Sequence, residues 1–263
     1  MNLVIMQARM GSSRLPGKVL MKVCGRSLLE LQYERIQAAV KVDRIIVATT
    51  SGASDDAIAQ LCKNQNIEYF QGSENDVLDR FYQAARQAGC VNGDSIIRVT
   101  GDCPLLDPEV LDGVVDLFYT SGVDYASNIN PPTFPDGLDV EIFNYKSLAR
   151  AWREASLTSE REHVTPYIRT HPELFSQANY SRASDLSDLR LTVDEPEDLE
   201  IIRFIYESLY PQKPLFLLAD VLQVIDQNPS LLEINRGFAR NEGYEKSLRE
   251  DQLVRSGGKA HDA

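Results

Sequence analysis

Short apolar runs alternate with amphipathic stretches along the first half of the chain. The apolar runs are typical of strands, and they occupy residues 3–7 (LVIMQ), 44–50 (RIIVATT), 67–70 (IEYF) and 95–100 (SIIRVT). Between and after them, apolar side chains recur at helical spacing in residues 27–39, 56–65, 74–89 and 101–120. Strands separated by helices of this length predict βαβ units and a mainly parallel sheet, which is an α/β fold.

The rhythm changes between residues 122 and 180. A turn-rich segment (NINPPTFPDG) contains three prolines, and residues 138–143 (LDVEIF) then alternate apolar and polar positions as a half-buried strand does. We predict that residues 122–180 form an insertion that completes a pocket within a single domain of residues 1–250. Residues 189–193 (LRLTV) predict a last strand, and residues 251–263 predict a disordered tail.

The composition narrows the choice of partners and of compartment. The chain has 27 basic and 39 acidic residues, and a net charge of −12 argues against non-specific binding of nucleic acid, which needs a basic surface. The four cysteines have no paired spacing and there are only three histidines, so we expect reduced thiols and no zinc site. We find no signal-peptide pattern and no apolar run long enough to cross a membrane. We therefore expect a cytoplasmic protein that binds small molecules.

The segment at residues 8–18 (ARMGSSRLPGK) follows the first predicted strand and has the composition of a phosphate-binding turn. It is not a P-loop, because five residues separate Gly11 from Gly17 where that motif has four. Its small residues can expose backbone N–H groups, and its cations can make charge-assisted contacts with phosphates. The predicted phosphate contacts are Gly11, Ser12, Ser13, Arg14 and Lys18. The alternative is an ordinary strand-to-helix turn with two solvated cations.

Two aspartates that follow predicted strands are candidate magnesium ligands. Asp102 lies in a Gly-Asp-x-Pro turn after residues 95–100, and Asp194 follows residues 189–193. Either could instead satisfy backbone N–H groups, Asp102 in an Asx turn and Asp194 as a helix cap. Ligands of parallel sheets bind at the carboxyl ends of strands, so we expect both aspartates and the 8–18 loop to face one crevice. A cation loop with two such carboxylates suits metal-assisted nucleotidyl transfer.

These motifs resemble those of a known family. The 8–18 loop resembles the A-R-x-G-S-x-R-x-x-x-K loop of the cytidylyltransferases that activate 3-deoxy-manno-octulosonate and acylneuraminates. VTGDCPLLDP is similar to their magnesium motif and TVDEPEDLE to their D-x-P-E-D-L segment. FPDGLDVEIF, EREHVTPYI and NEGYEKSL resemble the branch called spore coat polysaccharide biosynthesis protein F. The resemblance implies a Rossmann-like three-layer sandwich of the nucleotide-diphosphosugar transferase type, with a mixed, mostly parallel seven-stranded sheet.

The resemblance also implies how the triphosphate and the metal are held. It carries Arg14 and Lys18 onto the triphosphate of CTP, and Asp102 and Asp194 onto Mg²⁺. The chain departs from the family pattern at Ser13, where many of the resembling loops have lysine. The loop of this chain therefore has one cation fewer.

The same resemblance points to the contacts of the nucleoside. Ala8 and Arg9 would lie beside the base and the ribose, and Arg80 would recognise cytosine. The alternative for Arg80 is an ion pair on the helix surface with Asp76, four residues earlier.

The segments PDGLDVEIF and SEREHVTPYI supply the candidate acceptor contacts. Asp139 and Glu141 lie two residues apart on a predicted strand and therefore point to one face, where we expect them to bind hydroxyls or an amine. The alternative is a solvent-facing edge strand with ordinary acidic residues. Arg161 and His163 are the candidates to bind an acidic group, and His163 is either a general base or a packed, hydrogen-bonded histidine.

The sequence predicts an Mg²⁺-dependent nucleotidyltransferase, with CTP as the expected nucleotide. It would activate a sugar-like acid or phosphate for surface polysaccharide biosynthesis and release pyrophosphate. The alternatives are a glycosyltransferase, for whose usual D-x-D motif the nearest string, DVLD, has the wrong spacing, and a non-catalytic subunit that binds a nucleotide sugar. The resemblance also implies a homodimer. Residues expected at its interface, or else in the core, are Trp152, Val164, Tyr167 and Ile168.

Overall fold

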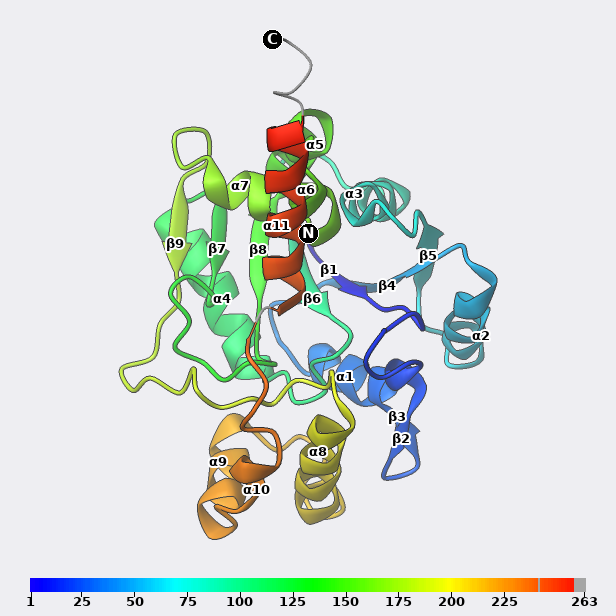
Figure 1. Ribbon diagram of the computed structural model, residues 1–263, viewed down its shortest axis with the longest axis vertical. Helices are drawn as coiled ribbons and strands as arrows, with labels where there is room; N and C mark the ends of the chain where they lie inside the picture. Colours follow the sequence, from blue (N-terminus) through cyan, green and yellow to red (C-terminus); the bar gives the residue numbers. More distant parts are fainter. Residues whose placement is uncertain (241, 258–263) are drawn as a thin grey trace.

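A seven-stranded sheet forms the centre of the structure, a computed structural model that describes residues 1–240 and 242–257 (Figure 1). The strand order is β5-β4-β1-β6-β8-β7-β9. The strands are β1 (Asn2–Gln7), β4 (Arg44–Thr50), β5 (Tyr69–Gly72), β6 (Ser95–Thr100), β7 (Tyr125–Ser127), β8 (Glu141–Asn144) and β9 (Gln177–Asn179). β8 runs antiparallel to both of its neighbours, and the other pairings are parallel. The prediction of a mixed, mostly parallel α/β sheet is confirmed.

Helices cover both faces of the sheet and complete a three-layer sandwich. Successive side chains of β1 point to opposite faces, so Val4 and Met6 belong to one hydrophobic cluster and Leu3 and Ile5 to another. The first cluster includes side chains of α1 (Leu28–Gln37), α2 (Asp56–Asn64) and α4 (Pro108–Ser121). The second includes side chains of α3 (Val77–Gln87), α5 (Tyr145–Glu154) and α7 (Pro166–Thr170). A third cluster contains α8 (Pro196–Leu209), α9 (Leu218–Gln227) and α10 (Leu231–Ile234).

Residues 122–180 extend the main sheet, and their description as an insertion that completes a pocket stays a prediction. They contribute β7, β8 and β9, and β8 lies between β6 and β7. The alternative of a solvent-facing edge strand at LDVEIF is therefore wrong. Register pairs Glu141 of β8 with Arg98 of β6, which brings opposite charges together inside the sheet.

The strand predicted at residues 189–193 does not form. The structure has an isolated bridge there, between Asp136 and Arg190. The turn that carries Asp136 lies very close to this segment. Gly137 in that turn has a φ of 101°, and a Cβ at its position would lie only 2.5 Å from the Leu191 carbonyl. Leu191 and Val193, the apolar positions of the alternating pattern, are buried, but the segment does not pair with another strand.

The four apolar residues expected at a dimer interface pack inside the protein. Val164, Tyr167 and Ile168 are buried in the second cluster, and Trp152 stacks on Tyr82 with ring centroids 4.2 Å apart. Packing within the core, the alternative to a dimer interface, therefore accounts for the low exposure of these side chains. The homodimer stays a prediction.

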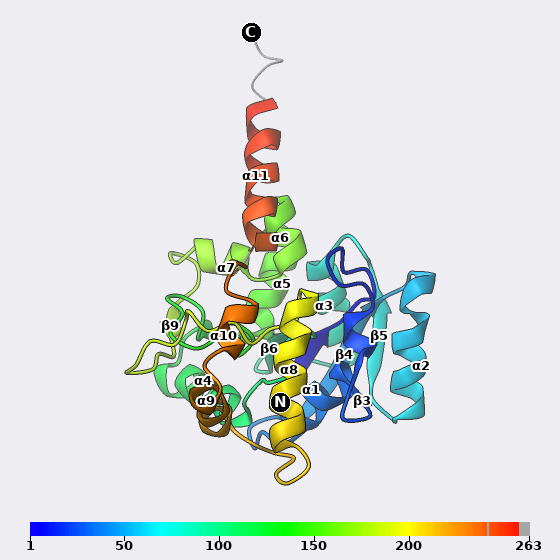
Figure 2. The same ribbon diagram turned by 60° about the horizontal axis from the view of Figure 1, so that its bottom comes forward.

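The C-terminal part of the described chain is helical. Helix α11 (Glu242–Gly257) lies beside α6 (Thr158–His163), as Figures 1 and 2 show. Residues 251–257, predicted as the start of a disordered tail, continue this helix, and residues 258–263 lie outside the described residues. No helix within residues 1–240 and 242–257 is long and apolar enough to cross a membrane.

Candidate active site

A cleft at the carboxyl ends of β1 and β6 contains two adjoining cavities. The loop cavity, about 390 Å³, lies against the 8–18 loop and includes Arg9, Ser13 and Arg80 in its lining. The strand cavity, about 280 Å³, lies against β6 and β8 and includes Asp139 and Glu141. Residues that line both cavities are Gln7, Arg14, Thr100, Asp102, His163, Asp194, Glu242 and Gly243. The two cavities are therefore parts of one site, as the strand-end positions predict.

The 8–18 loop folds back on itself at the mouth of the loop cavity. Met10 anchors it, because its carbonyl accepts hydrogen bonds from the N–H groups of Ser12 and Gly17, both at 2.9 Å. The Ser12 N–H is thus used within the turn, although the sequence predicted that it would face phosphate. Of the predicted nucleotide contacts, Ala8, Arg9, Ser12, Ser13, Arg14, Lys18 and Arg80 line the cavity, and Gly11 does not.

Arg80 is buried in the wall of the loop cavity, with a relative exposure of 2%. Its guanidinium donates to the Ser73 carbonyl at 2.6 Å, whereas Asp76 pairs with Arg161. Burial, with a smaller contribution from nearby Arg9, lowers the pKa of Arg80 to about 10. The alternative of an exposed Arg80–Asp76 pair on the helix surface is wrong, and Arg80 is placed where it can meet a ligand.

Lys18 lies between the two predicted magnesium ligands. Its ammonium donates to Asp102 at 3.1 Å and to Asp194 at 2.7 Å. Burial by itself would lower the pKa of Lys18, but the two carboxylates outweigh it and raise the pKa. Burial likewise opposes ionisation of Asp102, and Lys18 overcomes it and holds the Asp102 pKa at about 2. Lys18 and Asp102 are therefore both charged at neutral pH.

This arrangement fits a magnesium ion held by the two aspartates. Asp102 and Asp194 contact the same ammonium, so they can reach one cation, and their side chains are 26% and 22% exposed to the cleft. Residues 1–240 and 242–257 contain no cluster of three or more His, Cys, Asp or Glu side chains suited to a metal. Mg²⁺ needs only one or two carboxylates when phosphates and waters complete its shell.

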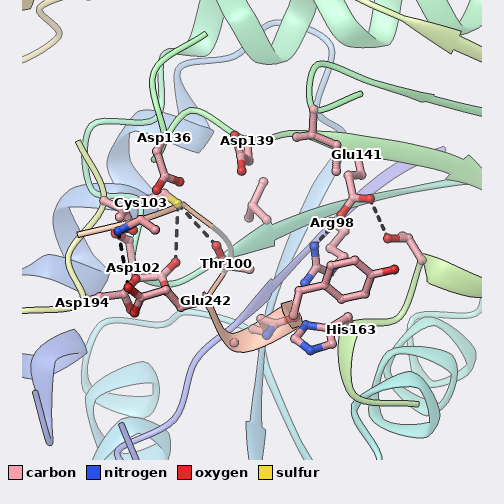
Figure 3. Close-up of a pocket in the computed structure, with 18 of the residues that line it drawn as sticks. Arg98, Thr100, Asp102, Cys103, Asp136, Asp139, Glu141, His163, Asp194 and Glu242 are labelled. Carbon is pink, nitrogen blue, oxygen red and sulfur yellow. Dashed lines mark hydrogen bonds and ion pairs between the residues drawn. The ribbon is translucent and has the colours of Figure 1, made fainter. Parts of the chain in front are cut away.

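Arg14 is surrounded by carboxylates at the junction of the two cavities. It forms ion pairs with Asp194 at 3.0 Å, with Glu195 at 3.1 Å and with Glu242 at 2.5 Å. Glu242 belongs to α11 and lies in the segment NEGYEKSL, which carried the branch resemblance but no predicted role in the site. Figure 3 shows Asp102, Asp194 and Glu242 gathered at one end of the strand cavity, opposite Arg98 and Glu141.

Asp139 and Glu141 line the strand cavity together, but both carboxylates already have partners. Glu141 is buried and accepts hydrogen bonds from Tyr125 and Thr165, both at 2.6 Å, and from Arg98. Burial would raise the pKa of Glu141, and the charge of Arg98 reverses the shift and lowers it. Asp139 pairs with Arg240, yet burial outweighs that pairing and raises the pKa of Asp139 to about 7.

Two arginines that the sequence interpretation missed face the strand cavity. Arg98 extends from the middle of β6, and Arg169 comes from α7. The Nε atom of each is buried and has no hydrogen-bond partner. The Arg169 guanidinium lies over the ring of Tyr244, 5.1 Å from its centroid. A charged residue inside the apolar run SIIRVT was an available signal for Arg98, whereas nothing in the sequence distinguished Arg169 from other surface arginines.

Arg161 and His163, the predicted contacts for an acidic group, have different surroundings. Arg161 lines neither cavity; it bonds to Asp76 and donates to the Trp152 carbonyl at 2.7 Å, so it joins α3, α5 and α6. His163 lines both cavities, and its Nε2 lies 3.0 Å from Ser247 Oγ. Burial, reinforced by Arg98, lowers the pKa of His163 to about 4, so the ring is neutral at pH 7.

The chain resembles known proteins over most of its length. A sequence model of the family described as "Cytidylyltransferase" matches residues 3–223. The spore coat polysaccharide biosynthesis protein SpsF of Bacillus subtilis is 34% identical over 86% of this chain and 95% of its own length. A 3-deoxy-manno-octulosonate cytidylyltransferase of Chlamydia trachomatis is 26% identical over 76% of this chain and 79% of its own. The solved structure of a cytidylyltransferase from Leptospira borgpetersenii has a TM-score of 0.81 at 34% identity, and the match covers 88% of this chain and 95% of that one.

Proposed function

The chain belongs to the cytidylyltransferase family and is a nucleotidyltransferase, and on this basis we propose that it transfers the cytidylyl group of CTP to a sugar acid. An acceptor oxygen would attack the α-phosphorus, the bond to the β-phosphate oxygen would break, and pyrophosphate would leave. The observation that carries the proposal is the contact of Lys18 with both Asp102 and Asp194 beside a cavity lined by the 8–18 loop.

In this reaction, the loop cavity would hold the nucleotide. Arg14 and Lys18 supply positive charge where negative charge develops on the leaving pyrophosphate, and Arg80 and Arg9 lie along the same wall for the nucleoside. Asp102 and Asp194 would hold Mg²⁺, which, when bound, polarises phosphate oxygens and neutralises their charge. Arg14 and Lys18 both contact carboxylates at present, so binding of a triphosphate would exchange some of these contacts for phosphate oxygens.

The strand cavity would hold the acceptor, and Arg169 is the group in it that is suited to an anion. The carboxylates of Asp139 and Glu141 have the arginine partners Arg240 and Arg98, which leaves Arg169 without a carboxylate partner among residues 1–240 and 242–257. A buried guanidinium donor without a partner costs stability unless a ligand satisfies it. The named activities of the relatives also support a sugar acid that enters polysaccharide biosynthesis.

The experiment that tests the function is an assay of pyrophosphate release with each of the four ribonucleoside triphosphates. Each would be paired with ulosonic acids, sugar phosphates and polyol phosphates, with Mg²⁺ and with EDTA. We expect release with CTP and an ulosonic acid, and its loss with EDTA. Absence of release from every pair contradicts the proposal. Release of a nucleoside diphosphate from a nucleotide sugar would indicate a glycosyltransferase instead.

A further inference from the structure

Helix α11 lies beyond the part of the chain that the family model matches, yet it lines the candidate active site. The matched region ends at residue 223, and α11 begins at Glu242. Three of its residues, Glu242, Gly243 and Lys246, line the loop cavity. The cavity that would hold the nucleotide is therefore completed by a segment outside the family match.

Contacts with α6 fix how α11 faces the cleft. Ser247, which is buried, donates to Glu162 at 2.7 Å and lies 3.0 Å from His163 Nε2. Asp251, also buried, accepts a hydrogen bond from the Ser159 N–H at 3.2 Å. Ser247 and Asp251 are four residues apart and so lie on one side of the helix. Glu242 and Lys246 are also four residues apart, and their side faces the loop cavity.

The charges that line the loop cavity single out Lys246. The lining contains five cations, namely Arg9, Arg14, Lys18, Arg80 and Lys246. Arg14 and Lys18 are held by carboxylates, and Arg80 is buried against a carbonyl. Arg9 and Lys246 are exposed and form no ion pair in the described part of the chain. Arg9 is the residue proposed for the nucleoside, which leaves Lys246 as the cation that can meet the phosphates without first leaving a carboxylate.

We propose that Lys246 is a triphosphate-binding residue, supplied to the active site by α11. The proposal rests on the proposed function, because it requires the nucleotide to occupy the loop cavity. Lys246 lines the same cavity as the 8–18 loop, in which Ser12 and Ser13 are uncharged. An ammonium there offsets phosphate charge that the loop cations, already bound to carboxylates, offset only in part.

The test measures the affinities of CTP and CMP by calorimetry for the full-length protein and three variants. Lys246→Ala should weaken CTP binding by about tenfold, which corresponds to one charge-assisted hydrogen bond at the cavity mouth. The loss should be smaller for CMP, which carries less phosphate charge, and Lys246→Arg should retain CTP binding. Arg249→Ala is the matched control, because it removes one cation from the same helix at a residue that does not line the loop cavity.

The outcomes separate this inference from the proposed function. If the unchanged protein binds none of the nucleoside triphosphates, the proposed function fails. If it binds CTP and Lys246→Ala binds it equally well, only the role of Lys246 is overturned. Equal losses in Lys246→Ala and Arg249→Ala, or equal losses for CTP and CMP, also overturn it. Both positions are exposed, and matching thermal unfolding of the variants would exclude a folding defect.

Discussion

The loop cavity and the strand cavity assemble their charges in different ways. In the loop cavity, Lys18, Asp102 and Asp194 all belong to motifs that can be recognised in the sequence, and Lys18 contacts both aspartates directly. In the strand cavity, charged groups come one at a time from separate elements, as Arg98 from β6 and Arg169 from α7 do. The difference shows that sequence motifs identified Lys18, Asp102 and Asp194 in the loop cavity, and Asp139 and Glu141 in the strand cavity, whereas the arginines of the strand cavity depend on tertiary packing.

The largest effect is expected in the strand cavity, at Glu141. Glu141→Gln removes the carboxylate that pairs with Arg98 and leaves a buried guanidinium without an opposite charge. Loss of one partner of a buried ion pair lowers the free energy of unfolding by about 3–5 kcal/mol. Urea denaturation would measure this loss, with the exposed Glu173→Gln as the control. A loss below about 1 kcal/mol, the range of a surface ion pair, would return Glu141 to the role of an acceptor contact.

In the loop cavity, carboxylates are expected to matter for turnover. Asp102→Asn and Asp194→Asn each remove a proposed magnesium ligand, and turnover should fall on the order of 10²–10³-fold, as when one group that stabilises transition-state charge is lost. CTP affinity should change much less, because the metal acts chiefly on charge that develops in the reaction. Steady-state kinetics and calorimetry would separate the two, with the exposed Asp226→Asn as the control. Normal turnover in Asp194→Asn would leave that residue as an ion-pair partner of Arg14, Lys18 and Arg190 only.

A pH dependence distinguishes Asp139 from these carboxylates. Its folded-state pKa is about 7, above the usual value of an aspartate in an unfolded chain, so the folded protein binds this proton more tightly. Protonation of Asp139 therefore stabilises the folded protein at low pH. This stabilisation, about 2 kcal/mol once solvent screening is allowed for, is lost as pH rises through about 7. Asp139→Asn should remove this loss between pH 5 and 8 in urea denaturation. An unchanged pH slope in the variant would contradict the assignment.

Sequence-based predictions were correct where a local pattern sufficed and failed where tertiary packing decided the structure. β-branched runs identified β1, β4 and β6, because such runs are buried on both faces of a parallel sheet. The alternation in LRLTV predicted a strand that does not form, because burial of Leu191 needs only one apolar face and not a paired neighbour. Lys18 was predicted from a local motif. No role in the cleft was predicted for Arg169 or for Glu242, although Glu242 lies in the recognised segment NEGYEKSL, because their places in the cleft depend on how α7 and α11 pack.

The smallest predicted effect compares Arg169, which the structure favours, with Arg161, which the sequence favoured. Arg169→Gln should raise the acceptor KM by about tenfold, because it removes a charge-assisted contact with an anionic group. Arg161→Gln should leave the acceptor KM unchanged, because that side chain is held by Asp76 and the Trp152 carbonyl outside both cavities. The acceptor would be the one identified by pyrophosphate release.

CTP affinity, measured alongside, decides what a change in KM means. The Arg169 guanidinium packs on Tyr244 of α11, so a disturbed helix would weaken CTP binding together with the acceptor KM. A raised acceptor KM at constant CTP affinity is therefore the signature of a direct contact. If Arg161→Gln raises the acceptor KM and Arg169→Gln does not, the acceptor binds outside the strand cavity. In that case, the unpartnered Nε of Arg169 has a structural cause rather than a ligand.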